Sequence, residues 1–214
     1  MHVQELAPGL WRWTERHPEW TPEAGAEGWE AEVGCVYWEG DDSVCLVDPL
    51  LPEDGEERDR FRRHLDADVE RAARPVAVVL TISFHSRDAR EVADRYDGEL
   101  WVFERDVPSS EVEAERRYRA GDRLPGGFEA RETRRPEGLL WLPARRALVA
   151  GDVLLGGPLR VCPWFRSSEA RAETTAALRP LLDLPIELVL TSHGEPVLAD
   201  GRAALARALD DAAA

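Results

Sequence analysis

The chain has 214 residues, of which 43% are hydrophobic, and its formal net charge is −15 at pH 7. This length is enough to bury a core and predicts one domain over residues 1–214, while the negative charge argues against nucleic-acid and anionic membrane partners. No apolar run approaches the roughly 18 residues of a membrane span, residues 1–5 lack the basic start of a signal peptide, and the three cysteines have no CxxC spacing. We therefore expect a cytoplasmic protein.

The first half of the chain predicts a β-hairpin followed by alternating helices and strands. A strand is expected to begin at residues 10–13, and residues 14–32, rich in Pro, Gly and Glu, predict a long loop or lid. Apolar runs at residues 33–39 and 44–48, separated by Gly-Asp-Asp-Ser, predict the hairpin. Residues 56–73 carry apolar side chains at spacings of four and three, which indicates an amphipathic helix. The other elements expected in this half are strands at 76–81 and 100–103 and helices at 88–96 and 111–118.

The second half repeats this arrangement of strands followed by helices. We expect strands at residues 128–133, 139–142, 147–150 and 187–191, and helices at 168–182 and 202–213. Two sheets packed face to face, with helices on both outer sides, would bury these apolar strands. The sequence therefore predicts an α/β fold whose four layers run α, β, β, α.

Three of the apolar runs lead to side chains that bind metals. The run at residues 77–81 continues to His85 and Asp88, the run at 147–151 to Asp152, and the run at 188–192 to His193. In layered α/β folds, ligands gather where the strand ends meet the loops. Two imidazoles and two carboxylates suit zinc, iron or manganese, so these four residues predict one shared metal site.

Each of these residues also has a structural interpretation. A histidine after a strand often serves as a hydrogen-bonded structural residue, and an aspartate after glycine often caps a turn. Ser83 and Ser86 lie close to His85 in sequence and could be considered as catalytic nucleophiles. No G-x-S-x-G motif surrounds them, which argues against that role. Cys162 is expected to be a structural residue.

The strand ends resemble those of the metallo-β-lactamase superfamily. Residues 46–49 (LVDP) are similar to that family's early strand ending in a structural Asp, and residues 148–152 (LVAGD) to the strand whose Gly-Asp supplies a metal-bridging carboxylate. Residues 191–196 (TSHGEP) are similar to the late strand carrying the last metal-binding His. The resemblance spans most of the chain and implies a four-layer αββα sandwich with metal between its sheets.

The family's H-x-H-x-D-H motif is degenerate in this chain. Residues 83–88 (SFHSRD) keep the second His as His85, replace the first with Ser83, replace the Asp with Arg87, and place Asp88 at the last position. A register shifted by one residue would leave no ligand at the last two positions. The isolated middle His of the family has no counterpart in residues 133–138, where Glu137 is the substitute ligand on offer.

The resemblance implies one of two functions. In the first, His85, Asp88, Asp152 and His193 hold one zinc, iron or manganese ion, and the chain hydrolyses a small ester, thioester or lactone, with Asp152 and Arg87 acting in the reaction. In the second, the site has lost its metal, Arg87 pairs with Asp88 or Asp152 as a salt bridge, and the protein is a catalytically inactive binding or scaffold protein.

Aromatic side chains are expected around the site. Two loops rich in them flank it in the fold that the chain resembles, and the candidates for lining its mouth are Trp11, Trp13, Trp20, Trp29, Trp164 and Phe165. Core packing or a homodimer interface would account for the same residues. The expected ligand is a small molecule.

Overall fold

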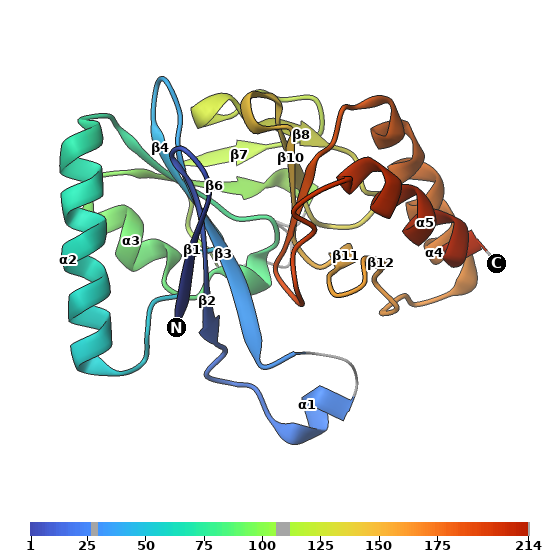
Figure 1. The fold of residues 1–214 in the computed structure, drawn as a ribbon, viewed down its shortest axis with the longest axis horizontal. Helices are drawn as coiled ribbons and strands as arrows, with labels where there is room; N and C mark the ends of the chain where they lie inside the picture. The colour runs from blue at the N-terminus through green and yellow to red at the C-terminus, as the bar shows by residue number, and fades with distance from the viewer. Residues whose placement is uncertain (27–29, 106–111, 214) are drawn as a thin grey trace.

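The computed structural model describes residues 1–26, 30–105 and 112–213, and within them two β-sheets lie side by side between helices (Figure 1). The first sheet has the strand order β1-β2-β3-β4-β5-β6-β7. These strands are β1 (His2–Ala7), β2 (Leu10–Arg16), β3 (Glu32–Glu39), β4 (Val44–Val47), β5 (Val76–Val79), β6 (Glu99–Phe103) and β7 (Arg116–Tyr118). The first four pair antiparallel, and β4 to β7 pair parallel.

The second sheet has the order β13-β10-β9-β8. Its strands are β8 (Glu129–Arg131), β9 (Leu139–Leu142), β10 (Ala147–Ala150) and β13 (Leu188–Thr191), and a separate ribbon joins β11 (Leu154–Leu155) to β12 (Arg160–Val161). β10 and β13 run parallel with Ala150 opposite Thr191, so the residues that follow these two strands emerge together at one edge of the sheet. That edge carries the candidate site.

The helices form the outer layers. α2 (Gly55–Ala72) and α3 (Ala89–Arg95) cover the first sheet, while α4 (Ser168–Leu178) and α5 (Gly201–Ala213) cover the second (Figure 1); α1 (Pro22–Ala26) lies in the loop between β2 and β3. One apolar cluster joins both sheets, for example through Val47 and Val79 on one side and Leu140 and Val149 on the other. The layers therefore run α, β, β, α, as predicted. Among the described residues, no helix is both long and apolar enough to cross a membrane.

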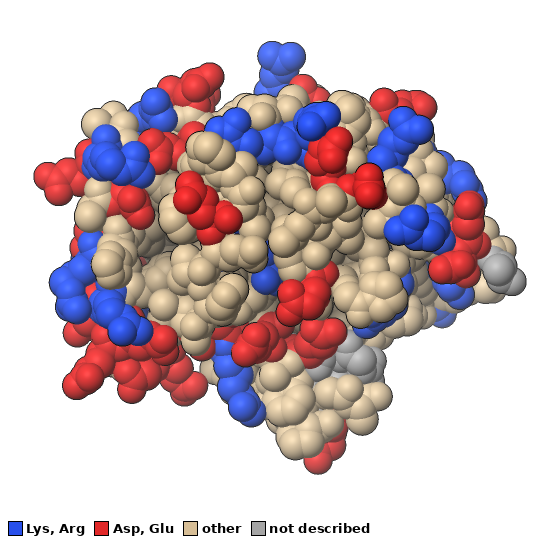
Figure 2. Space-filling model, in the orientation of Figure 1, with Lys and Arg blue, Asp and Glu red and all other residues tan. Residues whose placement is uncertain are grey.

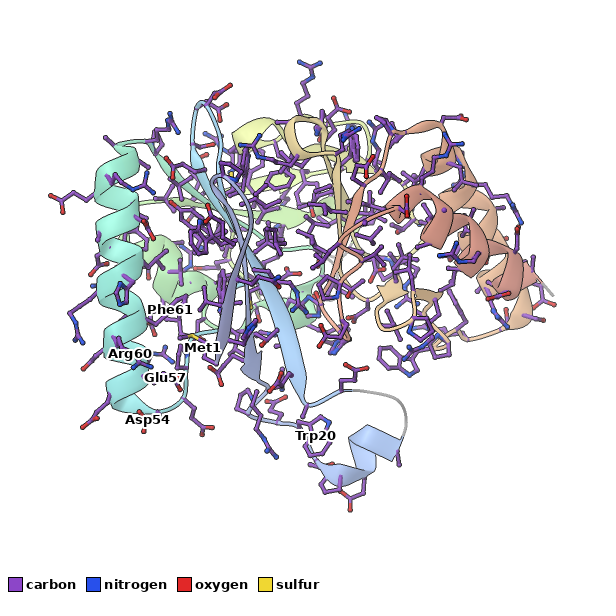
Figure 3. All side chains as sticks on the ribbon, in the orientation of Figure 1. Met1, Trp20, Asp54, Glu57, Arg60 and Phe61 are labelled. Atoms are coloured by element: carbon purple, nitrogen blue, oxygen red, sulfur yellow. The ribbon has the colours of Figure 1, made fainter. Side chains whose placement is uncertain are left out.

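α2 shows how the sequence specifies one of these layers. The Asp54 side chain accepts a hydrogen bond from the backbone N–H of Glu57, which caps the helix at its start. Phe61 points from the helix toward the first sheet (Figure 3), where its ring lies 5.3 Å from that of Trp13. Acidic side chains gather on the surface over the first turn of α2 (Figure 2), where the helix dipole favours negative charge.

Most of the predicted elements are present, with ends shifted by a few residues. The helix predicted at 111–118 is wrong over the described residues 112–118, while residue 111 lies outside them. Residues 116–118 form β7 instead, pairing parallel with β6. The buried Tyr118 donates its hydroxyl to the carbonyl oxygen of Leu80 and packs 5.4 Å from the ring of Phe103, so tertiary contacts outweigh local helix propensity. The strands β1, β11 and β12 were not expected from the sequence.

Candidate metal centre

Three predicted ligands converge where the two sheets meet. His85 ends a short 3₁₀ helix (Ser83–His85) after β5, Asp152 follows β10, and His193 follows β13. The Nε2 atoms of His85 and His193 lie 3.2 Å and 3.4 Å from Oδ1 of Asp152. One potential ligand atom from each residue lies within 4.8 Å of the other two, which is the spacing of side chains around a shared ion.

Asp48 fixes the orientation of the His85 ring. Its Oδ2 atom lies 2.9 Å from Nδ1 of His85, and its carboxylate also accepts hydrogen bonds from the backbone N–H and the hydroxyl of Thr81. Asp48 has a positive φ of 50°, a conformation that aspartate tolerates better than most residues. When the ring is neutral, a carboxylate that accepts a hydrogen bond from Nδ1–H leaves the lone pair of Nε2 directed at the candidate site, an arrangement that recurs around metal-bound histidines.

His193 is held by the first sheet. The backbone N–H of Gly34 on β3 donates to the carbonyl oxygen of Ser192 at 2.7 Å. The buried guanidinium of Arg12 on β2 donates to the carbonyl oxygens of Thr191 at 3.4 Å and Gly194 at 3.1 Å. The segment that carries His193 is therefore fixed from both sheets.

Asp152 owes its position to the glycine before it. A Cβ atom at Gly151 would lie 2.5 Å from Oγ1 of Thr81, closer than a side chain can approach. The strand end can therefore pass against Thr81 and bring Asp152 beside His85 only with glycine at that position. This contact gives a physical reason for the Gly-Asp pair that the sequence shows.

The three residues are strongly coupled electrostatically. Burial and the positive charge of Arg87 oppose protonation of His85, but Asp48 and Asp152 outweigh them and raise its pKa to about 9. Burial alone would raise the pKa of Asp152, but the two imidazoles hold it well below its ordinary value. A positive charge at His85 thus balances buried carboxylates, and a divalent cation would do the same.

The cluster fits a transition-metal ion in its donor set. Within the described residues, Oδ1 of Asp152 is buried but accepts no hydrogen bond of good geometry, although two imidazole nitrogens face it. Two nitrogens and one carboxylate oxygen suit zinc, iron or manganese and leave a fourth position for water or substrate.

Two predicted site residues lie outside this cluster. Asp88 accepts hydrogen bonds from the backbone N–H of Leu51 and from the guanidinium of Arg58, both at 2.7 Å, so the structure does not bring it together with the other three. Arg87 donates to the carbonyl oxygen of Asp48 at 3.4 Å. Among the described residues, no ion pair joins Arg87 to Asp88 or Asp152, contrary to the salt bridge expected of a degenerate site.

Glu137, the substitute ligand suggested by sequence, is fully buried and also lies outside the three-residue cluster. Its Oε1 atom lies 3.3 Å from Nε of Arg135. Burial raises its pKa to about 8; the positive charge of Arg135 opposes that shift and the negative charge of Asp152 reinforces it. The charges of Glu137 and Asp152 are therefore coupled, although Glu137 is not one of the three candidate ligands.

The cluster opens into a cavity of about 330 Å³. Its lining consists of His17, Glu19, Phe84, His85, Arg87, Asp152, Trp164 and His193. A neighbouring cavity of about 590 Å³ shares His17, Glu19, Phe84 and Arg87 with it, so the two cavities adjoin along these residues. Trp164 lines the site as expected, with its ring 6.1 Å from that of His193.

Sequence reasoning missed His17, which follows β2. Its Nδ1 atom accepts a hydrogen bond from the backbone N–H of Glu19 at 3.2 Å, so in the neutral ring the proton is carried by Nε2. Burial, then the charge of Arg87, lowers its pKa and favours that neutral form. No spacing pattern marks His17 in the sequence, because it lies in an irregular loop.

Two of the predicted tryptophans lie away from the site, whereas the two serines line the neighbouring cavity. Trp11 and Trp13 pack with Phe61 of α2 around a separate apolar cavity, so they do not line the site, and Trp29 lies outside the described residues. Ser83 and Ser86 line the larger cavity. Burial raises the pKa of Cys162 to about 11, so it stays a thiol at neutral pH.

Comparison with known proteins shows similarity at the level of three-dimensional structure. No protein-family model matches the chain, and no curated protein sequence matches it. The metallo-beta-lactamase IND-7 superposes with a TM-score of 0.68 at 15% identity, covering 100% of this chain and 98% of that one. The metallo-beta-lactamase FIM-1 from Pseudomonas aeruginosa, in its mono-zinc form, gives 0.65 at 12% identity, with 99% and 95% covered.

A third similar structure is a metallo-beta-lactamase family protein from Thermus thermophilus. It superposes with a TM-score of 0.64 at 16% identity, covering 97% of this chain and 80% of that one. At these identities the likeness shows a shared fold.

Proposed function

We propose that this chain, which has the metallo-β-lactamase fold, is a metal-dependent hydrolase with a mononuclear site that acts on a small ester, thioester or lactone. The observation that carries this proposal is the convergence of His85 and His193 on the carboxylate of Asp152, at the mouth of a cavity of about 330 Å³. FIM-1, which has a similar fold, has a crystal structure in a mono-zinc form, and this supports a site for a single ion here.

The proposed ligands are Nε2 of His85, Nε2 of His193 and a carboxylate oxygen of Asp152. A zinc, iron or manganese ion held there would act as a Lewis acid and activate water at neutral pH. Asp48 keeps the proton of His85 on Nδ1, so that Nε2 is available as a ligand. Arg12 and Gly34 keep His193 in place from the first sheet.

The other lining residues position the substrate. In the hydrolysis, the oxygen of water forms a bond to the carbonyl carbon, the bond from that carbon to the leaving oxygen or sulfur breaks, and the leaving group takes up the proton released by water. Trp164 and Phe84 give the cavity apolar walls. Arg87 lines the same cavity, where its positive charge favours a negatively charged substrate.

A metal-free binding or scaffold protein is the second candidate. The observation that favours it is the ion-pair geometry: His85 and His193 both contact Asp152, so a protonated imidazole can balance the carboxylate without any ion. The two candidates differ in metal content and in hydrolytic activity.

The experiment is a hydrolysis assay on protein purified without chelator and supplied with zinc. The substrates are 4-nitrophenyl acetate, acetylthiocholine and γ-butyrolactone, and the variant is Asp152→Ala, with Asp210→Ala on the exposed face of α5 as its control. We expect the wild type and the control to hydrolyse at least one substrate and Asp152→Ala to lose at least about a hundredfold in rate. Equal activity in Asp152→Ala would place the chemistry elsewhere, and a wild type that retains no zinc and hydrolyses none of the three substrates would favour the metal-free binding or scaffold protein.

A further inference from the structure

Among the described residues, Arg87 has no carboxylate partner within ion-pair distance, unlike Arg58. Arg58, which lines the same larger cavity, pairs with Asp88 and with Glu91. Among the described residues, the guanidinium of Arg87 makes one hydrogen bond, to the carbonyl oxygen of Asp48 at 3.4 Å, and its Nε is buried without a partner. A guanidinium has five N–H donors, so most of the binding capacity of Arg87 is unused in a chain of charge −15.

The backbone at Arg87 is also unusual. Its φ is +28°, a region that non-glycine residues rarely occupy. The residues around it are anchored: His85 by the carboxylate of Asp48, and Asp88 by the backbone carbonyl oxygen of Pro49, which accepts its N–H at 3.3 Å. Such strain persists where the surrounding structure enforces it, and it is concentrated at ligand-binding positions.

Arg87 lies between the metal cluster and the larger cavity. Arg87 lines both cavities, whereas His85, Asp152 and His193 line only the smaller cavity. A substrate whose carbonyl group sits at the cluster would therefore place a more distant part of itself beside Arg87. This position suits recognition of a substrate group better than contact with the carbonyl oxygen that reacts.

Among the described residues that line the two cavities, Arg87 is a half-buried cation without an ion-pair partner. Arg58 is neutralised by Asp88 and Glu91, while the side chains of Arg16, Glu19 and Glu53 are exposed, where water and salt screen them. Arg87 is half-buried, and its positive charge contributes to the lowered pKa of His17. A partly buried cation without a counter-ion favours an anionic ligand.

We propose that the substrate carries a carboxylate and that the guanidinium of Arg87 binds it while the scissile carbonyl lies at the metal cluster. The substrate class is then a carboxylate-bearing ester, thioester or lactone, with its bulk in the larger cavity. Arginine suits this task because its planar fork can donate two parallel hydrogen bonds to a carboxylate. This assignment rests on the proposed hydrolase function.

The first arm of the test compares two esters with the same leaving group. Mono-4-nitrophenyl glutarate carries a free carboxylate, and 4-nitrophenyl methyl glutarate is its neutral counterpart. In zinc-supplied wild type, kcat/KM should be about 10 to 100 times higher for the free acid, mainly through a lower KM. Arg87→Gln should remove this preference, whereas Arg179→Gln, which lies outside both cavities, should keep it and hydrolyse both esters like the wild type. Arg87→Lys should keep part of it, because lysine retains the charge without the fork.

The second arm measures glutarate binding by calorimetry and needs no hydrolysis. The wild type should bind glutarate at least tenfold more tightly than Arg87→Gln, and Arg179→Gln, on the far side of the second sheet, should bind like the wild type. If the wild type binds glutarate and Arg87→Gln does not, but the wild type hydrolyses no ester, the proposed hydrolase function is wrong and the anion site at Arg87 is supported. If the wild type binds no glutarate, or Arg87→Gln binds it equally well, the assignment of Arg87 is overturned whatever the activity.

Discussion

Oδ2 of Asp48 lies 2.9 Å from Nδ1 of His85, and Nε2 of the same ring lies 3.2 Å from Asp152. The aspartate that ends the β4 segment thus sets which nitrogen of His85 faces the candidate ligands. The sequence motif identifies His85 as a candidate ligand. The contact with Asp48 holds the proton of the neutral ring on Nδ1, and a metal binds the nitrogen that carries no proton.

Asp48→Asn should weaken metal binding while largely preserving the fold. The asparagine amide can donate a hydrogen bond to Nδ1, which favours the ring form with its proton on Nε2 and blocks coordination. We expect zinc affinity to fall by about 10- to 100-fold, measured by competition with a chromophoric chelator. Asp88→Asn is the matched control, because Asp88 contacts Leu51 and Arg58 and not the cluster. An unchanged affinity in Asp48→Asn would show that Asp48 does not orient the ligand.

The substitution Glu137→Gln should stabilise the folded protein, relative to the wild type, by an amount that increases as the pH rises. Burial raises the folded-state pKa of Glu137 from 4.5 to about 8, so between these values the folded state binds more protons than the unfolded state. The stability from this group is fully present below pH 4.5 and is lost as the pH rises through about 8.

The measurement is urea denaturation of chelator-treated protein at pH 5, 7 and 9. The free energy of unfolding of Glu137→Gln, relative to that of the wild type, should rise by more than about 1 kcal/mol between pH 5 and pH 9. Glu173→Gln, on the exposed face of α4, should show no such trend. Parallel stability curves for the wild type and Glu137→Gln would contradict the buried, protonated carboxyl group.

Gly34→Ala should destabilise the junction between the sheets. An added Cβ would lie 2.6 Å from Nη2 of Arg12 and 2.7 Å from the carbonyl oxygen of Thr191. Relieving this overlap must shift Arg12 or the segment that carries His193, at a cost of about 1 to 3 kcal/mol. Gly55→Ala is the control, since a Cβ there meets nothing within 4 Å. Equal melting temperatures for the two variants would show that the junction adapts freely.

The sequence predicted those site residues that follow apolar strands. His85, Asp152 and His193 each come shortly after such a run, and the parallel pairing of β10 with β13 brings the last two together. Asp88 has the same local signal but faces Arg58, which comes from α2. Its partner is 30 residues away in sequence, so no local pattern could reveal that the side chain points away from the cluster.

The elements that sequence reasoning missed depend on distant contacts in the same way. The local sequence of residues 116–118 predicts a helix. These residues form a strand because they pair with the free edge of β6. His17 lies in an irregular loop, and its position in the cavity depends on a turn closed by the hydrogen bond from Trp20 to its carbonyl oxygen. Only the folded chain shows these relationships.

The metal content of the purified protein tests the central claim most directly. Wild type exposed to zinc and passed through a desalting column should retain one zinc per chain by elemental analysis, because three side chains converge on one point. Asp88→Ala should retain the same amount, while Asp152→Ala should lose the ion, since two imidazoles alone hold it weakly. A wild type without stoichiometric metal, or an Asp152→Ala variant that retains it, would contradict a metal site at His85, Asp152 and His193.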